Sequence, residues 1–150
     1  MQTPEDYMWR CIELARMARQ AGDTPVGSLI VRDAKVIAEG IEAIKARRDI
    51  TAHAEIEAIR NACQALGSLD LRGCILYTTA EPCWMCSYAI RHTGVSGVVI
   101  GAPVASVGGV SSRHPILTDS ALECWPTAPA VTCGILRAEC QSLKREQTTT

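Results

Sequence analysis

The sequence predicts an α/β protein, a three-layer α/β/α sandwich around a central mixed five-stranded sheet. Segments rich in β-branched residues alternate with segments of helical periodicity after an initial hairpin, which is typical of a sheet covered by helices on both faces. The chain has 150 residues, of which 47% are hydrophobic, and we find no internal repeat and no linker. We therefore expect one domain over residues 1–150.

The first half of the chain predicts two helices and a hairpin. Apolar residues recur at helical spacing from residue 4 to about residue 21, where a glycine follows. The strands "VGSLIVRD" and "KVIAEGIE" flank a short Asp33-Ala34 connection, which is typical of a hairpin. The polar segment "AIKARRDI" is expected to be a loop, and a helix runs from about Thr51 to Gly67.

The second half predicts three more strands and three more helices. "CILYTT" and "GVVIG" are expected to be buried strands, and Pro82 opens a helix that ends near Thr93. A Gly- and Ser-rich loop over residues 102–115 follows the second of these strands. The remaining expected elements are a short helix over 116–122, a strand near Val131, a final helix over 135–146 and a frayed "QTTT" end.

Composition excludes several classes of protein. Fifteen basic and sixteen acidic side chains give a net charge of −1, so no overall field attracts nucleic acid. No apolar run approaches the roughly 20 residues that span a bilayer, so we expect no membrane partner. The start, "MQTPEDYMWR", lacks the apolar core of a signal peptide, which predicts a cytoplasmic protein and argues against pairing the eight cysteines as disulfides.

Three residues form a candidate zinc site. "EPCWMC" places Cys83 and Cys86 three positions apart at a helix start, where free N–H groups and the helix dipole favour thiolates. His53 also lies at a helix start, so the two helices can bring all three ligands together. One histidine and two cysteines leave a fourth position for water, which is the pattern of a catalytic zinc site with one Zn²⁺ per chain.

Glu55 is the candidate catalytic residue. Zinc lowers the pKa of a bound water to about 7, so hydroxide is available at neutral pH. A nearby carboxylate can take the proton of that water and pass it to a leaving amine. Because His53 and Glu55 leave the helix in different directions, we expect Glu55 to approach the water and not the metal.

Each part of this pattern is ambiguous when it stands alone. An isolated C-x-x-C is also typical of redox sites, structural zinc or simple packing, and an isolated H-x-E carries little information. A fourth protein ligand would make the site structural and the protein a binding module, and the only other histidines are His92 and His114. The combination of both motifs at two helix starts favours catalysis.

The motifs "HAE" and "PCWMC" match the H-x-E and P-C-x-x-C signature of zinc deaminases. Through "TPVGSLIV", "TAHAEIEAIR", "LYTTAEPCWMC" and "GILRAEC", the chain resembles the branch of the cytidine deaminase-like superfamily that contains guanine deaminases and bacterial tRNA adenosine deaminases. The resemblance implies attack of hydroxide on an amino-bearing ring carbon with loss of ammonia. It also implies that backbone N–H groups near Ala54 and Cys83 orient water and substrate, and that the protein is a homodimer, although a tetramer remains open.

Glu42 is a candidate substrate-reading residue. Members of this branch commonly carry an asparagine after the second strand in a G-x-N setting, whereas this chain has Gly40-Ile41-Glu42. An ionised glutamate only accepts hydrogen bonds, so it suits a ring edge rich in N–H donors, such as that of guanine or an aminotriazine. The alternative is that Glu42 points to solvent at the end of the strand.

Two more departures argue against a tRNA substrate, and one feature favours it. The tail "LRAECQSLKREQTTT" is less basic and less aromatic than the family's longer final helix, and "VASVGG" lacks the charged residues that the family carries there. The basic cluster "KARR" over residues 45–48 could instead meet phosphates, or it is a solvated loop. Nucleic acid is therefore possible as a partner but disfavoured.

The sequence thus predicts a zinc-dependent hydrolytic deaminase that releases ammonia from a small amino-substituted heterocycle. The expected substrates are guanine-like purine bases or nucleosides, or related amino-pyrimidines and amino-triazines. Wobble adenosine in tRNA is the alternative. Besides Glu42, the candidate substrate-binding residues are Val26, Ala54, Glu81, Trp84, Arg113, His114 and Trp125. His114 is equally expected to be a surface turn residue, and a tryptophan such as Trp125 more often packs in a core.

Overall fold

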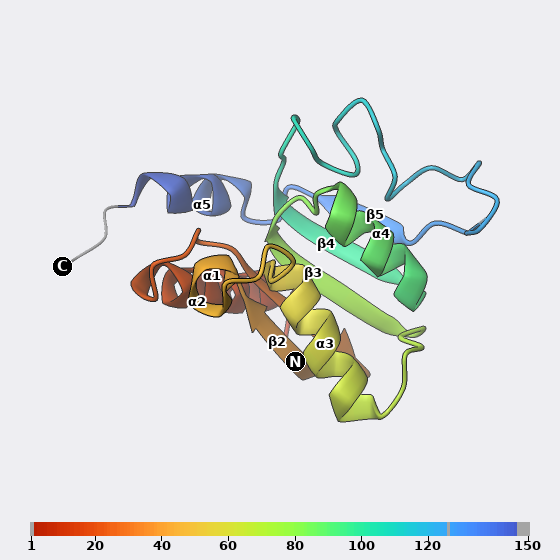
Figure 1. The fold of residues 1–150 in the computed structure, drawn as a ribbon, viewed down its shortest axis with the longest axis horizontal. Coiled ribbons are helices and arrows are strands. Elements are labelled where there is room, and N and C mark those ends of the chain that lie inside the picture. The colour runs from red at the N-terminus through yellow and green to blue at the C-terminus, as the bar shows by residue number, and fades with distance from the viewer. Residues whose placement is uncertain (1, 126, 147–150) are drawn as a thin grey trace.

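Five strands form one mixed sheet in the computed structural model, which describes residues 2–125 and 127–146 (Figure 1). The spatial order is β2-β1-β3-β4-β5, in which β1 pairs antiparallel with β2 and β3, while β3, β4 and β5 are parallel. The strands are β1 (Gly27–Arg32), β2 (Lys35–Ile41), β3 (Cys74–Ala80), β4 (Gly97–Ala102) and β5 (Ala130–Cys133). The predicted mixed five-stranded sheet is confirmed.

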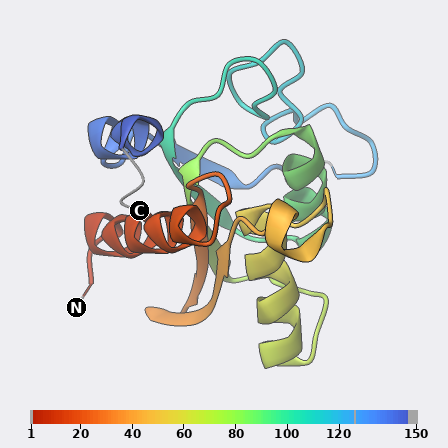
Figure 2. The ribbon, with the colours of Figure 1, turned by 60° about the vertical axis from the view of Figure 1, so that its left-hand side comes forward.

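Helices cover both faces of this sheet. The α-helices are α1 (Pro4–Gln20), α2 (Ile44–Arg47), α3 (Ala54–Leu66), α4 (Trp84–Thr93) and α5 (Arg137–Ser142), and a 3₁₀ turn, η1, follows at Leu143–Arg145. Figure 2 shows α1 and α5 on one side of the sheet and α3 and α4 on the other. The three-layer α/β/α arrangement is therefore confirmed.

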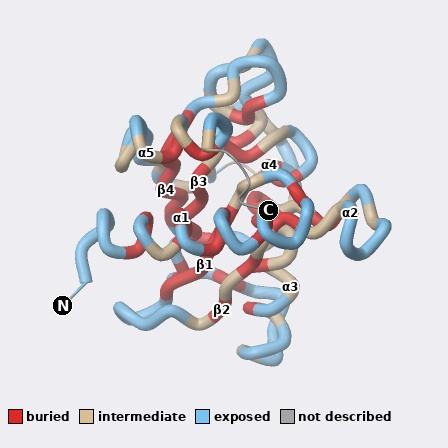
Figure 3. Tube along the Cα trace, turned by 90° about the vertical axis from the view of Figure 1, so that its left-hand side faces the viewer, coloured by how far each residue is buried: buried red, intermediate tan, exposed pale blue. Residues whose placement is uncertain are grey.

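Two apolar cores lie on opposite faces of the sheet, because side chains alternate along each strand. Leu29 and Val31 of β1 pack with α1 and α5, while Ile30 packs on the other face with α3 and α4. The central strands β1, β3 and β4 are accordingly the most continuously buried part of the chain, while β5 and the start of β2 at the sheet edges are largely exposed (Figure 3). This packing fixes the two helix starts that carry the predicted metal ligands.

The hairpin and the first helix follow the predicted local chemistry. Asp33 and Ala34 both have positive φ, as a tight two-residue connection requires. The Thr3 side chain accepts from the Asp6 amide, and the Asp6 carboxylate accepts from the Thr3 amide, which caps α1 at both groups.

Both site helices begin later than the sequence predicts. α3 starts at Ala54 and not at Thr51, and α4 starts at Trp84 and not at Pro82. The residues just before them, His53 and Cys83, have extended backbones (φ −70° and ψ 154°; φ −70° and ψ 177°) and occupy the cap positions. Neither side chain caps its helix, so both are free to face the space between the helices.

Three other expectations about secondary structure are wrong in detail. The predicted polar loop contains the short helix α2, and residues 116–122 form turns and not a helix. The final helix starts at Arg137 and not at residue 135, because Gly134 and Leu136 have positive φ. The predicted frayed end, Gln147–Thr150, lies outside the described residues.

In the part of the chain that the structure describes, no helix combines the length and the apolar character that crossing a membrane requires.

Candidate active site

The predicted metal ligands meet where β3 ends and α4 begins. His53 precedes α3, Cys83 precedes α4, and Cys86 lies in the first turn of α4. Their ligand atoms all lie within 4.8 Å of one another, and they are the one group of three or more such residues in the described part of the chain. The fold thus brings His53 together with two cysteines that lie 30 and 33 positions further along the chain.

The distances within this group fit a tetrahedral zinc ion. The Nδ1 atom of His53 lies 3.6 Å from the sulfur of Cys83 and 3.5 Å from the sulfur of Cys86. Zinc bonds of about 2.3 Å to sulfur and 2.0–2.1 Å to nitrogen, at a tetrahedral angle, place the nitrogen and sulfur about 3.6 Å apart. Both nitrogen–sulfur distances therefore match those of zinc held through the Nδ1 atom of His53 and the two sulfurs.

Hydrogen bonds among the three ligand side chains shift their pKa values in opposite directions. Hydrogen bonding from Cys86, and then from His53, lowers the pKa of Cys83 to about 4 despite burial. The same bond to Cys83, together with burial, raises the pKa of the Cys86 thiol. The hydrogen bond to Cys83 also raises the pKa of His53 to about 9. The group thus already stabilises a thiolate, which is the form of cysteine that binds zinc.

Glu55 lies in the first turn of α3, next to the ligand group, and its side chain is buried. Burial raises the pKa of Glu55 to about 7, and the nearby Glu42 carboxylate adds to the rise. A carboxyl group with this pKa can hold or release a proton near neutral pH. Glu55 is not one of the clustered ligands, in keeping with its predicted place beside the metal.

Glu42 is buried at the same site and does not point to bulk solvent. Only 8% of the residue is exposed, and its Oε1 accepts the backbone N–H of Ala54 at 2.8 Å. Among the described residues Oε2 accepts no hydrogen bond, and it is not fully enclosed. Burial raises the pKa of Glu42, although His53 and the Ala54 amide oppose the rise. One carboxylate oxygen thus satisfies the start of α3, and the other remains available.

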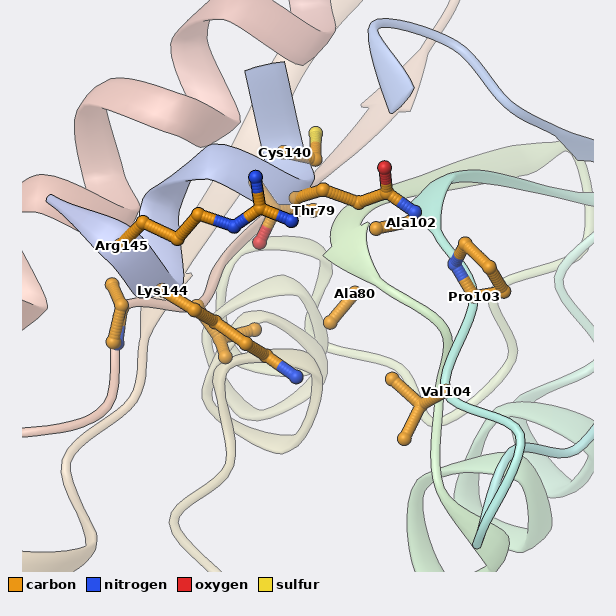
Figure 4. Close-up of a pocket in the computed structure, with 11 residues that line it drawn as sticks. Thr79, Ala80, Ala102, Pro103, Val104, Cys140, Lys144 and Arg145 are labelled. Atoms are coloured by element: carbon orange, nitrogen blue, oxygen red, sulfur yellow. The ribbon is translucent and has the colours of Figure 1, made fainter. Parts of the chain in front are cut away.

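A cavity of about 300 Å³ lies at the same edge of the sheet, beyond the last residues of β3 and β4. Its apolar wall includes Val26, Ala80 and Val104, and the Val26 carbonyl accepts the backbone N–H of Glu42 at 3.1 Å. Figure 4 shows Lys144 and Arg145 reaching over this cavity from the C-terminal end of the chain. The cavity is large enough for part of a heterocyclic ligand and carries positive charge on one side.

Glu81 is buried, but its carboxylate is engaged by the segment after β4. Its oxygens accept from the backbone N–H groups of Val104, Val110 and Ser111 at 2.8–3.0 Å, and from the Ser111 hydroxyl at 2.6 Å. Burial alone would raise the pKa of Glu81, but the Ser111 hydroxyl and these amides bring it below the ordinary glutamate value. Glu81 therefore shapes the backbone beside Cys83.

The other predicted substrate-binding residues divide into two groups. Trp84 directly follows the ligand Cys83, its ring lies 5.5 Å from that of His114, and its indole N–H donates to the Ser112 hydroxyl at 3.0 Å. Arg113 is exposed between Ser112 and His114. Trp125 instead packs 4.7 Å from Tyr88 and 5.8 Å from His92, toward the far end of α4. The structure does not bring Trp125 to the metal ligands.

Two structurally important residues were missed in the sequence. Asp23 is buried, and its carboxylate accepts the backbone N–H groups of Lys45 and Ala46, which fixes the basic segment before α3. Arg91 is buried in the last turn of α4 and donates to three backbone carbonyls. Their partners lie 22 to 34 positions away, so no local pattern could have identified either residue.

A family model for the cytidine and deoxycytidylate deaminase zinc-binding region matches residues 1–102. The chain therefore belongs to this family of zinc-binding deaminases, which are hydrolases that act on C–N bonds, and zinc is the metal that its ligand group is built to hold.

Relatives of two kinds are similar to this chain. It is 40% identical over 118 residues to a tRNA-specific adenosine deaminase of Aquifex aeolicus, covering 79% of this chain and 78% of the relative. It is 47% identical over 87 residues to a guanine deaminase of Bacillus subtilis, covering 57% and 56%. A solved structure from work on A-to-I editing by tRNA:A34 deaminases superposes with a TM-score of 0.84 and 34% identity, covering 91% and 97%.

Proposed function

We propose that residues 1–150 form one zinc-dependent deaminase domain in which His53, Cys83 and Cys86 hold zinc and Glu55 moves protons. The observation that carries this proposal is the grouping of the three ligand atoms within 4.8 Å beside a buried carboxyl group. Zinc, when bound, lowers the pKa of a coordinated water and so supplies a nucleophile at neutral pH.

The chain's own residues supply the remaining steps. The Glu55 carboxyl, with its pKa near 7, accepts a proton from water and donates one to the departing amino group. Burial of Glu55 and Glu42 keeps bulk water away from this transfer. Glu42 holds the Ala54 N–H in place, which fixes the first turn of α3 and with it the direction of His53 and Glu55.

Adenosine at the wobble position of tRNA is the substrate that we propose first. The matches to the Aquifex relative and to the similar solved structure span most of this chain and most of each of those proteins. Both proteins are described as acting on tRNA adenosine. They favour this alternative over the small heterocycle that the sequence favoured. The exposed cations Lys45, Arg48, Lys144 and Arg145 supply charge that phosphates would meet.

A guanine-like free base or nucleoside is the second candidate, and the buried Glu42 carboxylate favours it. The Ala54 N–H, which would otherwise face a substrate acceptor, is already bonded to Glu42. The remaining carboxylate oxygen accepts hydrogen bonds from ring N–H groups, and it repels the ring-nitrogen acceptors of adenine. The guanine deaminase relative is consistent with this candidate over the shorter matched region.

An ammonia-release screen decides between the two substrates. The purified zinc-loaded chain is incubated with an anticodon stem-loop that carries wobble adenosine, and with guanine, guanosine, amino-pyrimidines, amino-triazines and pterins. Inosine formation in the stem-loop, weakened by rising salt, supports the first candidate; turnover of guanine or guanosine alone supports the second. Zinc retention without turnover of any of them would contradict the proposed enzyme and favour a structural-zinc binding module.

We also propose that the enzyme is a cytoplasmic homodimer. The exposed apolar residues Met85 and Tyr88 on α4, together with the exposed Val107, offer apolar surface that a second copy can cover. Sedimentation at several protein concentrations tests the assembly, and a monomer throughout would contradict it.

A further inference from the structure

A long segment beside α4 is held in place by two buried charged residues. Residues 103–125 contain no helix or strand, and Figures 1 and 2 show them running along α4 at one end of the molecule. Glu81 fixes the beginning of this segment through Val104, Val110 and Ser111. The other anchor is Arg91, which has no part in the proposed chemistry.

Arg91 binds the second half of the segment through its backbone. Its guanidinium donates to the carbonyls of Ile116 and Asp119, both at 2.8 Å, and to the carbonyl of Trp125. The residue is only 4% exposed, and no carboxylate pairs with it among the described residues. A buried guanidinium needs acceptors, and an irregular segment needs donors for its carbonyls, so each stabilises the other. These bonds also explain why residues 116–122 form turns in place of the predicted helix.

The same segment also contacts Trp84, the residue that follows the ligand Cys83 in the chain. The Ser112 hydroxyl accepts a hydrogen bond from the Trp84 indole N–H, and the His114 ring packs against the Trp84 ring. Along α4 the Trp125 ring packs against Tyr88 and His92. α4 thus carries a metal ligand in its first turn and Arg91 in its last turn. The segment contacts α4 at both ends, through Trp84 and through Arg91.

We propose that Arg91 is a positioning residue that sets the substrate-facing rim of the active site by fixing residues 112–125. This inference rests on the proposed function, since it takes Trp84 and His114 as part of the rim that substrate meets. Arg91 acts through the backbone of the segment and does not touch the metal ligands. Its loss should therefore weaken substrate binding while zinc binding persists.

The variant Arg91→Met tests this role, because methionine fills much of the same volume without donating hydrogen bonds. We expect faster amide hydrogen exchange over residues 112–125, one zinc per chain, a KM raised about tenfold and a kcat within about twofold of the unchanged enzyme. KM is measured with the stem-loop or guanine, whichever the unchanged enzyme turns over. The matched control is Arg72→Met, since Arg72 is exposed and pairs only with Asp70 among the described residues.

The conservative variant Arg91→Lys covers the case in which Arg91→Met does not fold. Lysine keeps the charge but cannot bond three carbonyls in a fixed fork, so exchange and KM should both lie between those of the unchanged enzyme and Arg91→Met. Faster exchange over 112–125 with an unchanged KM would overturn the proposal, as would unchanged exchange. An unchanged enzyme that turns over no substrate would defeat the proposed function, whereas hydrogen exchange would still test the anchor.

Discussion

The Oε1 atom of Glu42 accepts the backbone N–H of Ala54 at 2.8 Å, and this bond joins the end of β2 to the first turn of the helix that carries His53 and Glu55. One side chain thus has two roles at once: it satisfies a helix start and it places an acceptor beside the site. The roles can be separated by substitution.

Glu42→Gln should change the order of substrates. The glutamine oxygen can still accept from Ala54, while its NH₂ group replaces the available oxygen with a donor. If the guanine candidate is right, turnover of guanine relative to adenosine falls by at least about tenfold, measured as the ratio of kcat/KM. The matched control is Glu57→Gln, because Glu57 lies in the first turn of α3, the turn to which Glu42 is bonded through Ala54. An unchanged ratio would show that Glu42 does not contact the ring.

Cys86→Ser should abolish stable zinc binding and activity together. Serine does not supply the thiolate that the site requires, and two protein ligands hold zinc far more weakly than three. Zinc content by mass spectrometry should fall from one per chain to near zero. Cys133→Ser removes an exposed thiol of the same chain and should leave zinc unchanged. Full zinc occupancy in Cys86→Ser would contradict the ligand assignment.

Glu81 should make the protein less stable in acid. Its pKa is lowered in the folded protein, so its contribution is fully present above the ordinary value of 4.5 and is lost as the pH falls through the folded pKa. Glu81→Gln should lower the free energy of unfolding by about 2 kcal/mol at pH 7 and flatten its decline below pH 4.5. Denaturant titration at several pH values measures both effects; an equally steep decline in the variant would assign the acid sensitivity to other carboxylates.

Gly40→Ala should destabilise the packing of α3 on β2. A Cβ atom there would lie 2.3 Å from the Ala54 carbonyl oxygen and 2.4 Å from the Ala58 nitrogen, both in backbone. We expect a loss of about 1–3 kcal/mol in the free energy of unfolding. Gly97→Ala is the control, because its Cβ would meet other atoms only at ordinary contact distances of 3.5 Å or more. Equal stability of the two variants would contradict the close approach of helix and strand.

The sequence alone predicted the sheet, the principal helices and the ligand group, because these depend on local periodicity and on short motifs. It predicted the ends of α3 and α4 but not their starts, since nothing in the composition of His53 and Cys83 distinguishes a cap position from the first helical turn. The roles of Glu81 and Arg91 depend on carbonyls and amides distant in the chain. For Trp125 the sequence left both a pocket role and packing open, and its ring packs on Tyr88 and His92, where Arg91 holds its backbone.

Glu55→Gln tests the central claim most directly, since glutamine keeps the shape of the side chain but cannot carry the proton. Zinc content and ammonia release are measured on the same purified sample, with the substrate that the unchanged enzyme prefers. We predict one zinc per chain and a fall in kcat of about 10²–10⁴-fold. Zinc retained together with unchanged ammonia release would contradict the proton-transfer role of Glu55.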